Sequence, residues 1–140
     1  MAVILASSCL LGCECRYKGD GCKCDALIKL AESNTIIGVC PEQMGGLSTP
    51  RDPAERQGDK VISCAGKDVT KAYTKGAETA LYFAKLNHVD FAVMKAKSPS
   101  CGKGLIYDGT FTGNKIPGNG VTVELLNANG CLLYTSPSPR

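Results

Sequence analysis

Residues 2–9 read AVILASSC, a short apolar run that ends in a cysteine. Two later segments repeat this pattern, because residues 35–40 read TIIGVC and residues 91–101 read FAVMKAKSPSC. Short apolar runs without polar alternation are typical of strands that are covered on both faces, as in parallel sheets. The pattern therefore predicts buried strands over residues 3–6, 36–39 and 91–94.

The segments between these runs have helical patterns. We expect Asp25 to cap one helix, with Leu27, Ile28 and Ala31 on one face. Thr70 is expected to cap a longer helix with an apolar face of Tyr73, Ala77, Ala80, Leu81 and Ala84. A third helix over 121–129 is expected to stop at Gly130, before a fourth strand over 132–134. This alternation predicts an α/β fold, a three-layer, Rossmann-like domain with a central, mostly parallel sheet of about four strands.

Two long segments do not fit the alternation. Residues 41–67 and 101–120 are rich in glycine, proline and turn signals, so we expect long ordered loops, which are usually functional. The last six residues, TSPSPR, have neither a strand nor a helix pattern. The sequence therefore predicts one domain over residues 1–134 and a tail over 135–140 that lies outside the fold.

Composition limits the class of protein. The chain has 140 residues, of which 44% are hydrophobic and 21% charged, as expected for a folded domain. Its net charge of +3 comes from scattered residues, which argues against a nucleic-acid-binding surface. No segment approaches the roughly 20 apolar residues of a membrane span, and the start of the chain lacks a signal-peptide pattern. We therefore expect a cytoplasmic protein.

Nine cysteines are unusual in a compartment where thiols stay reduced, and an odd number fits poorly with paired disulfides. Cys9, Cys40 and Cys101 each follow one of the predicted strands. Because the carboxyl ends of parallel strands meet at one edge of the sheet, where ligands collect, these three thiols are expected to converge there. The alternative is that they are small buried residues at strand ends.

Soft sulfur ligands without histidine select an iron–sulfur cluster, zinc or Cu(I). A structural zinc would need a fourth ligand, and His88, the single histidine, lies at a predicted helix end. A 4Fe–4S cluster on three cysteines leaves one iron open to an exogenous ligand. The remaining cysteines fall into two groups. Two CxC pairs are candidates for a second metal site: Cys13 with Cys15, and Cys22 with Cys24. Two single cysteines, Cys64 and Cys131, are expected to be packing residues.

Six segments of the chain together resemble the bacterial 2-thiouracil desulfurase family. They are SSCLLG (7–12), RYKGDG (16–21), VCPEQMGGLSTPRDPAE (39–55), DVTKAYTKGAE (68–78), KSPSCGKGLIYDGTFTG (97–113) and GNGVTVELL (118–126). The resemblance implies a 4Fe–4S cluster held by three cysteines, with the open iron taking the sulfur of a thiolated base. The matching ligands are Cys9, Cys40 and Cys101. The resemblance also implies that Glu42 and Ser100 are catalytic.

The implied roles are chemically reasonable. Replacing C=S by C=O requires hydroxide at carbon and an acceptor for the departing sulfur, and an open iron supplies the acceptor without net electron transfer. Glu42 would take a proton from water or pass one to the ring, and Ser100 would hydrogen-bond the substrate or relay that proton. The structural alternatives are a surface carboxylate for Glu42 and a local turn for Ser100.

Two arginines in the matched segments are weaker candidates. Arg16 and Arg51 would orient a carbonyl or phosphate of the substrate, or anchor loops by ion pairing, with Glu55 as a partner. Gly45 and Gly46 would allow close approach of a ligand or cluster, or simply form a turn.

The sequence thus predicts an iron–sulfur desulfurase for a small thiolated pyrimidine, with no membrane and no nucleic acid as partner. Two alternatives remain: a non-catalytic iron–sulfur or zinc module, and a redox thiol protein that uses the CxC pairs.

Overall fold

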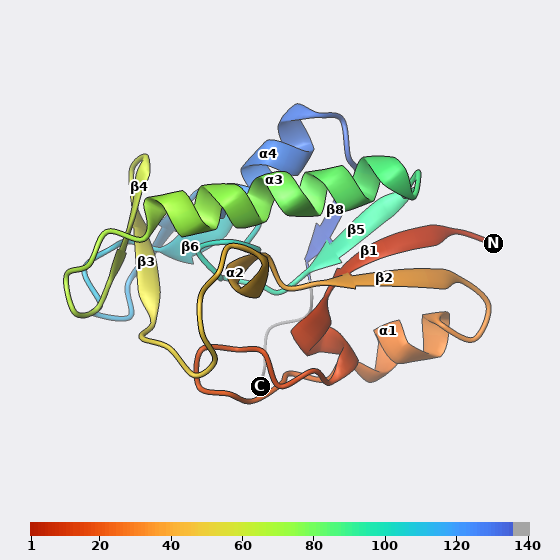
Figure 1. Cartoon of the computed structure of the whole chain (residues 1–140). Coiled ribbons are helices and arrows are strands. Elements are labelled where there is room, and N and C mark those ends of the chain that lie inside the picture. Colours follow the sequence, from red (N-terminus) through yellow and green to blue (C-terminus); the bar gives the residue numbers. More distant parts are fainter. Residues whose placement is uncertain (136–140) are drawn as a thin grey trace.

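A central parallel sheet organises the protein, whose residues 1–135 are described by a computed structural model (Figure 1). The sheet has the order β2-β1-β5-β8, and every neighbouring pair is parallel. Its strands are β1 (Val3–Ser7), β2 (Thr35–Val39), β5 (Phe91–Met94) and β8 (Leu133–Thr135). The predicted α/β fold with a four-stranded parallel sheet is confirmed.

Helices cover both faces of this sheet (Figure 1). The four helices are α1 (Asp25–Leu30), α2 (Pro41–Met44), α3 (Thr70–Leu86) and α4 (Val121–Ala128). Alternate residues of β1 enter two different cores: Leu5 packs with residues of α3 and α4, whereas Ile4 and Ala6 pack with Leu27 of α1. Burial on both faces explains why the strands lack polar alternation.

The order of the strands creates a switch point. β1 lies between β2 and β5, so the chain winds away from β1 in opposite directions on its two sides. The strand ends are level, because Ser7 pairs with Val39 and Ala6 with Val93. In open sheets of this kind, ligands bind outside the carboxyl ends of the strands at the switch point.

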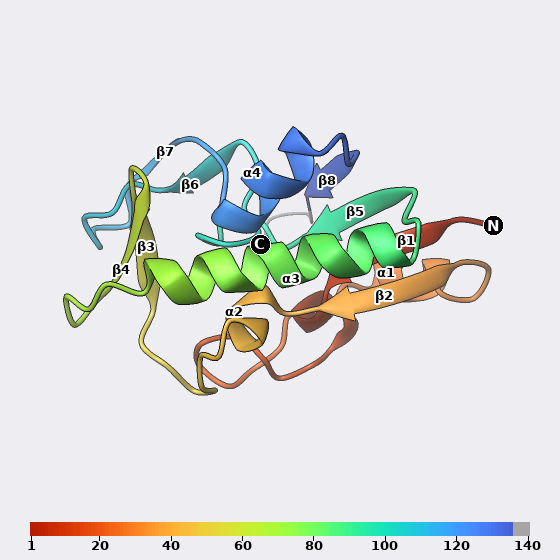
Figure 2. The ribbon, with the colours of Figure 1, turned by 45° about the horizontal axis from the view of Figure 1, so that its top comes forward.

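The two segments predicted as loops contain regular structure. The first segment holds α2 and a hairpin of β3 (Ala54–Gln57) and β4 (Lys60–Ser63). The second segment holds a hairpin of β6 (Leu105–Tyr107) and β7 (Lys115–Pro117). Both hairpins lie beyond the carboxyl edge of the sheet (Figures 1 and 2). A short 3-10 helix, η1 (Ser8–Leu11), follows β1 directly.

Some predicted boundaries were wrong by one residue. Asp25 and Thr70 are the first residues of their helices, and neither caps its helix with its side chain. Asp68 instead accepts a hydrogen bond from the Thr70 amide at 2.9 Å. Thr135 belongs to β8, so the predicted tail begins one residue too early, and its other residues, 136–140, lie outside the described part of the chain.

Helices α2 and α3 cross in direct backbone contact. A Cβ atom on Gly45 would overlap the carbonyl oxygen of Ala72, and one on Gly76 would overlap that of Pro41. The close approach that Gly45 permits is therefore to a helix, which holds α2 firmly at the end of β2. Within residues 1–135, no helix is long and apolar enough to cross a membrane.

Candidate functional site

A cavity of about 520 Å³ lies beside the switch point. One wall comes from the segments that follow β1, β2 and β5, and the facing wall comes from β3, the end of β6 and the turn after it. Cys9, Cys40 and Cys101 all line this cavity. Their role as metal ligands remains a prediction, but the topology brings these three distant thiols to one place.

Each of the three cysteines is placed by a different local structure. Cys9 lies in η1 and is buried, and its carbonyl accepts hydrogen bonds from the amides of Gly12 and Cys22 at 3.2 and 2.9 Å. Cys40 is the N-cap residue of α2, directly after β2. Cys101 is buried in the turn after β5, where its amide donates to the Ser98 hydroxyl at 3.0 Å.

A fourth thiol, that of Cys15, lines the same cavity and is also buried. Its sulfur contacts those of Cys9 and Cys40, and its carbonyl accepts a hydrogen bond from the Cys40 thiol at 3.8 Å. Sequence reasoning grouped Cys15 with the other three CxC cysteines, which do not line the cavity. Cys15 differs from the other three in lining the cavity because its loop folds back on η1.

The pKa values of Cys15, Cys40 and Cys101 are raised in the cavity. Burial raises the pKa of Cys101 to about 12, although hydrogen bonds with Ser7 and Ser100 lower it. The hydrogen bond with Cys15, together with burial, raises the pKa of Cys40. The same bond lowers the pKa of Cys15, but contact with Cys9 and burial bring it to about 11. Such thiols become ligands when a metal displaces their protons, as in other metal sites.

The thiols that line the cavity form a donor set of soft sulfur ligands, and no histidine in the described part of the chain lines the cavity with them. Soft sulfur ligands of this kind select iron–sulfur clusters, zinc or Cu(I). Among residues 1–135, no three His, Cys, Asp or Glu side chains are grouped as ligands of a single metal ion. The donor set fits a 4Fe–4S cluster.

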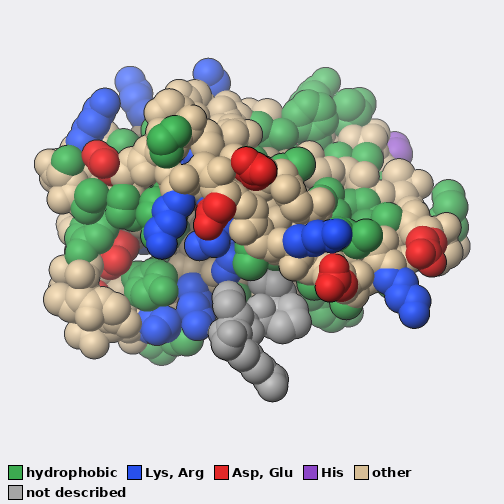
Figure 3. All heavy atoms as spheres, turned by 90° about the horizontal axis from the view of Figure 1, so that it is seen from below, with side chains coloured by type: hydrophobic (Ala, Val, Ile, Leu, Met, Phe, Trp, Pro, Cys, Tyr) green, Lys and Arg blue, Asp and Glu red, His purple; other side chains and the backbone are tan. Residues whose placement is uncertain are grey.

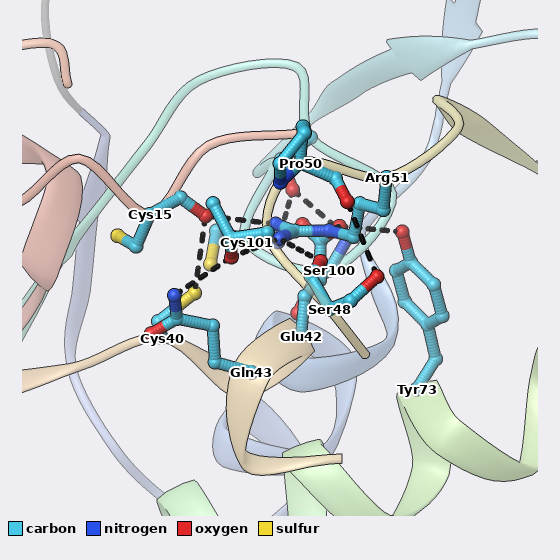
Figure 4. A network of polar contacts seen from close by, with 12 residues as sticks. Cys15, Cys40, Glu42, Gln43, Ser48, Pro50, Arg51, Tyr73, Ser100 and Cys101 are labelled. Atoms are coloured by element: carbon cyan, nitrogen blue, oxygen red, sulfur yellow. Dashed lines mark hydrogen bonds and ion pairs between the residues drawn. The ribbon is translucent and has the colours of Figure 1, made fainter. Parts of the chain in front are cut away.

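Glu42 lies in the first turn of α2 and lines the cavity, where its side chain meets those of Arg51 and Tyr73 (Figure 4). Its Oε1 atom accepts hydrogen bonds from the Tyr73 hydroxyl at 2.7 Å and from Arg51 Nε at 3.1 Å. Burial, followed by the Glu42 charge, raises the pKa of Tyr73, so this residue stays a donor. Oε2 has no hydrogen-bond partner within residues 1–135 and is available to a ligand.

The two candidate arginines differ in availability. Arg51 is an anchor: its side chain is only 7% exposed, and it also donates to the carbonyl of Cys15 at 2.9 Å and to two groups of the neighbouring loop, at Ser48 and Thr49. Neither arginine pairs with Glu55, the partner expected from the sequence, because Arg51 pairs with Glu42 and Arg16 with Asp20. Arg16 lines the cavity and is partly exposed, with Asp20 at 3.5 Å.

Further cations accompany these arginines. Lys95 and Lys97 also line the cavity. On the face of the molecule seen in Figure 3, Lys and Arg side chains are more numerous toward the hairpin end. Positive charge near thiolates favours their ionised form, so the surroundings suit an anionic metal–thiolate group.

Ser100 is 0% exposed and is not among the residues that line the cavity. Its hydroxyl lies 2.8 Å from that of Thr122 and also contacts the Cys101 thiol. Ser98 does line the cavity, and its hydroxyl accepts hydrogen bonds from the amides of Ser100 and Cys101, both at 3.0 Å. The turn predicted as the alternative role of Ser100 is thus formed by Ser98.

Three remaining cysteine and histidine predictions have clear outcomes. Cys131 packs against the core, as expected. Cys64 is exposed, so its assignment as a packing residue was wrong. His88 is exposed at the end of α3, as expected.

A doubly wound α/β sheet with converging thiols and an anchored carboxylate at its switch point defines a protein that binds a metal cluster. The sequence model of the family described as 2-thiouracil desulfurase matches residues 4–137. The chain belongs to this family.

Two individual proteins are similar over almost the whole chain. One is the uncharacterized protein YbbK of Bacillus subtilis (strain 168), 44% identical over 138 residues, with 91% of each chain covered. The other is a solved structure of the 4Fe-4S-dependent thiouracil desulfidase TudS, with a TM-score of 0.91 and 41% identity, covering 96% of this chain and 91% of that one.

Proposed function

We propose that this chain is a 4Fe–4S-dependent desulfurase that replaces the sulfur of a thiolated pyrimidine, such as 2-thiouracil, by oxygen. The observation that carries the proposal is the single cavity that holds Cys9, Cys40 and Cys101 together with the anchored carboxylate of Glu42. Family membership and the likeness to TudS support the same reaction and the same cofactor.

Cys9, Cys40 and Cys101 would hold the cluster. Bound on three thiolates, it supplies an iron with an open position, a Lewis acid that attracts the substrate sulfur and polarises the C=S bond. Cys15 lies against two of these ligands and shields them from water. Lys95 and Lys97 offset the negative charge of the thiolates.

Glu42 would act as the general base. The free Oε2 atom takes a proton from a water molecule as the oxygen of that water attacks the thiocarbonyl carbon. The C–S bond then breaks, and both protons of the water leave with the sulfur as hydrogen sulfide. Carbon keeps its oxidation state, so the reaction needs no electron donor. Tyr73 and Arg51 hold Oε1, which fixes the direction of Oε2.

Ser100 and Arg16 would support this chemistry from two sides. Through its contact with the Cys101 thiol, Ser100 sets the position of a ligand. The neighbouring Ser98 lines the cavity and holds the amides of Ser100 and Cys101. Arg16 would bind the carbonyl oxygen of the substrate ring, because it is the partly exposed arginine of the cavity. Arg51 would act on substrate indirectly, through Glu42.

The setting we propose is the cytoplasm, and the substrate is a free small molecule rather than nucleic acid. All nine cysteines are unpaired thiols, as expected in a reducing compartment. The net charge of +3 is too small to indicate a phosphate-tracking surface.

The test is anaerobic reconstitution with iron and sulfide, followed by incubation with 2-thiouracil. We expect brown protein that absorbs near roughly 400 nm, as iron–sulfur clusters do, and equal amounts of uracil and sulfide. The matched control is Cys64→Ser, an exposed cysteine that does not line the cavity, beside Cys40→Ser. Colourless protein in the wild type would refute the cluster. Brown protein without turnover would favour a non-catalytic module.

A further inference from the structure

The turn between β6 and β7 is tied to the neighbouring hairpin by a buried carboxylate. Glu55, on β3, accepts hydrogen bonds at Oε1 from the amides of Gly109 and Phe111, at 3.0 and 3.1 Å. Gln57 donates to the carbonyl of Gly109 at 2.9 Å. These hydrogen bonds from Glu55 and Gln57 fix the position of the turn beside the cavity.

Phe111 is held by this turn in an unfavourable state. Its φ is 59°, in the left-handed region that a bulky residue rarely adopts. Phe111 is 38% exposed, so apolar surface remains in water. A single exposed hydrophobic residue is ordinary on a protein surface. Backbone strain at an exposed hydrophobic residue is unusual, and strained residues of this kind cluster at sites that clamp a ligand.

Phe111 is one of the residues that line the cavity that holds the cysteines. The thiols come from the strand ends, and Phe111 comes from the hairpin beyond them. A flat ligand whose sulfur lies among the thiols therefore extends toward Phe111. Tyr107, on the same hairpin, also lines the cavity and extends this aromatic wall.

We propose that Phe111 is the substrate-binding platform of the site, packing on the face of the pyrimidine ring while the substrate sulfur lies among the cysteines. This rests on the proposed function and adds to it the residue that recognises the ring. Glu55 is the positioning residue, since it accepts a hydrogen bond from the amide of Phe111. Contact with a ligand would cover the exposed surface of Phe111.

The test uses uracil, the sulfur-free product, as a probe of ring binding to the reconstituted protein. Stacking of a base on an aromatic side chain is worth about 1–3 kcal/mol, which corresponds to roughly 5- to 150-fold in affinity. We expect Phe111→Ala to weaken uracil binding and raise KM for 2-thiouracil by a factor in this range. We expect kcat and iron content to change by less than about threefold, because the residue does not touch the reacting atoms.

Three further variants separate binding from folding. Phe111→Tyr keeps an aromatic face and should bind as the wild type does. Phe111→Gly relieves the positive φ, so it should lose binding while unfolding at the same temperature as the wild type, or higher. Tyr82→Ala removes an aromatic ring on α3 that is 61% exposed and outside the cavity, and should change nothing.

The possible failures can be told apart. Unchanged KM and uracil affinity in Phe111→Ala, with normal sulfide release, would overturn this inference and leave the desulfurase standing. Binding of uracil that depends on Phe111, without any sulfide release by the wild type, would refute the desulfurase and keep the ring platform.

Discussion

The hydrogen bond from Tyr73 to Glu42 gives the sharpest test of the site's architecture. Tyr73→Phe removes only the hydroxyl that donates to Oε1 at 2.7 Å, and leaves the packing of the ring on α3 intact. Arg51 still donates to the same oxygen. The variant therefore asks how much one of the two anchors contributes to holding the carboxylate.

The magnitude follows from the burial and charge of the pair. A hydrogen bond to a charged group contributes about 1.5–3 kcal/mol, and the cavity lets water replace part of it, so we expect a loss of about 1.5–2 kcal/mol in the free energy of unfolding. For a chain of this size that lowers Tm by about 4–8 °C. Activity should fall by roughly 10- to 100-fold, because a general base with one anchor is misplaced relative to the attacking water.

The assay is urea denaturation of the protein without cluster, together with a double-mutant cycle of Tyr73→Phe and Glu42→Ala. Residues in direct contact should show a coupling energy above about 0.5 kcal/mol. Tyr82→Phe, on the exposed side of the same helix, is the matched control.

A coupling energy near zero would show that the Tyr73–Glu42 bond does not exist in solution. Full activity of Tyr73→Phe, alongside a normal loss of stability, would show instead that Glu42 needs no second anchor. Either result would refute the reasoning that links this bond to catalysis.

Three other predictions concern the remaining parts of the site. Glu42→Gln should keep the absorbance of the cluster and lower turnover by about 10²–10⁴-fold, the usual contribution of a general base, and added reductant should not restore it. Ser100→Ala should lower the free energy of unfolding by about 1–3 kcal/mol, because it leaves the buried Thr122 hydroxyl without its partner, and calorimetry would measure this; an unchanged Tm would count against the buried pair. Iron analysis after anaerobic purification should separate two sets of Cys→Ser variants. Substitution of Cys9, Cys40 or Cys101 should remove most of the iron, whereas substitution of Cys13, Cys22 and Cys24 should leave nearly all of it.

The parts of the site that the sequence made predictable are those carried by buried strands. Cys9 and Cys40 directly follow apolar runs, and the carboxyl ends of parallel strands must share an edge, so their convergence needs no further information. The family resemblance added Glu42, whose neighbourhood has no distinctive pattern of its own.

Other features depend on contacts between distant residues and left no local signal. The hairpin strand β3 reads AERQ, polar and short, without the alternation that indicates a half-buried strand. Cys15 enters the cavity only because its loop folds back on η1. Phe111 adopts a positive φ that its residue type does not suggest, since a buried carboxylate on another hairpin imposes it.

The backbone contact between α2 and α3 also bears on how this protein could be redesigned. Positions 45 and 76 accept no side chain, so the wall that carries Glu42 cannot be reshaped by substitution there. The facing wall, around Tyr107 and Phe111, is made of side chains on a hairpin and can change without moving that crossing. A library meant to admit bulkier thiolated compounds should therefore vary the hairpin and leave the glycines alone. Catalytic machinery and substrate range would then be open to separate selection.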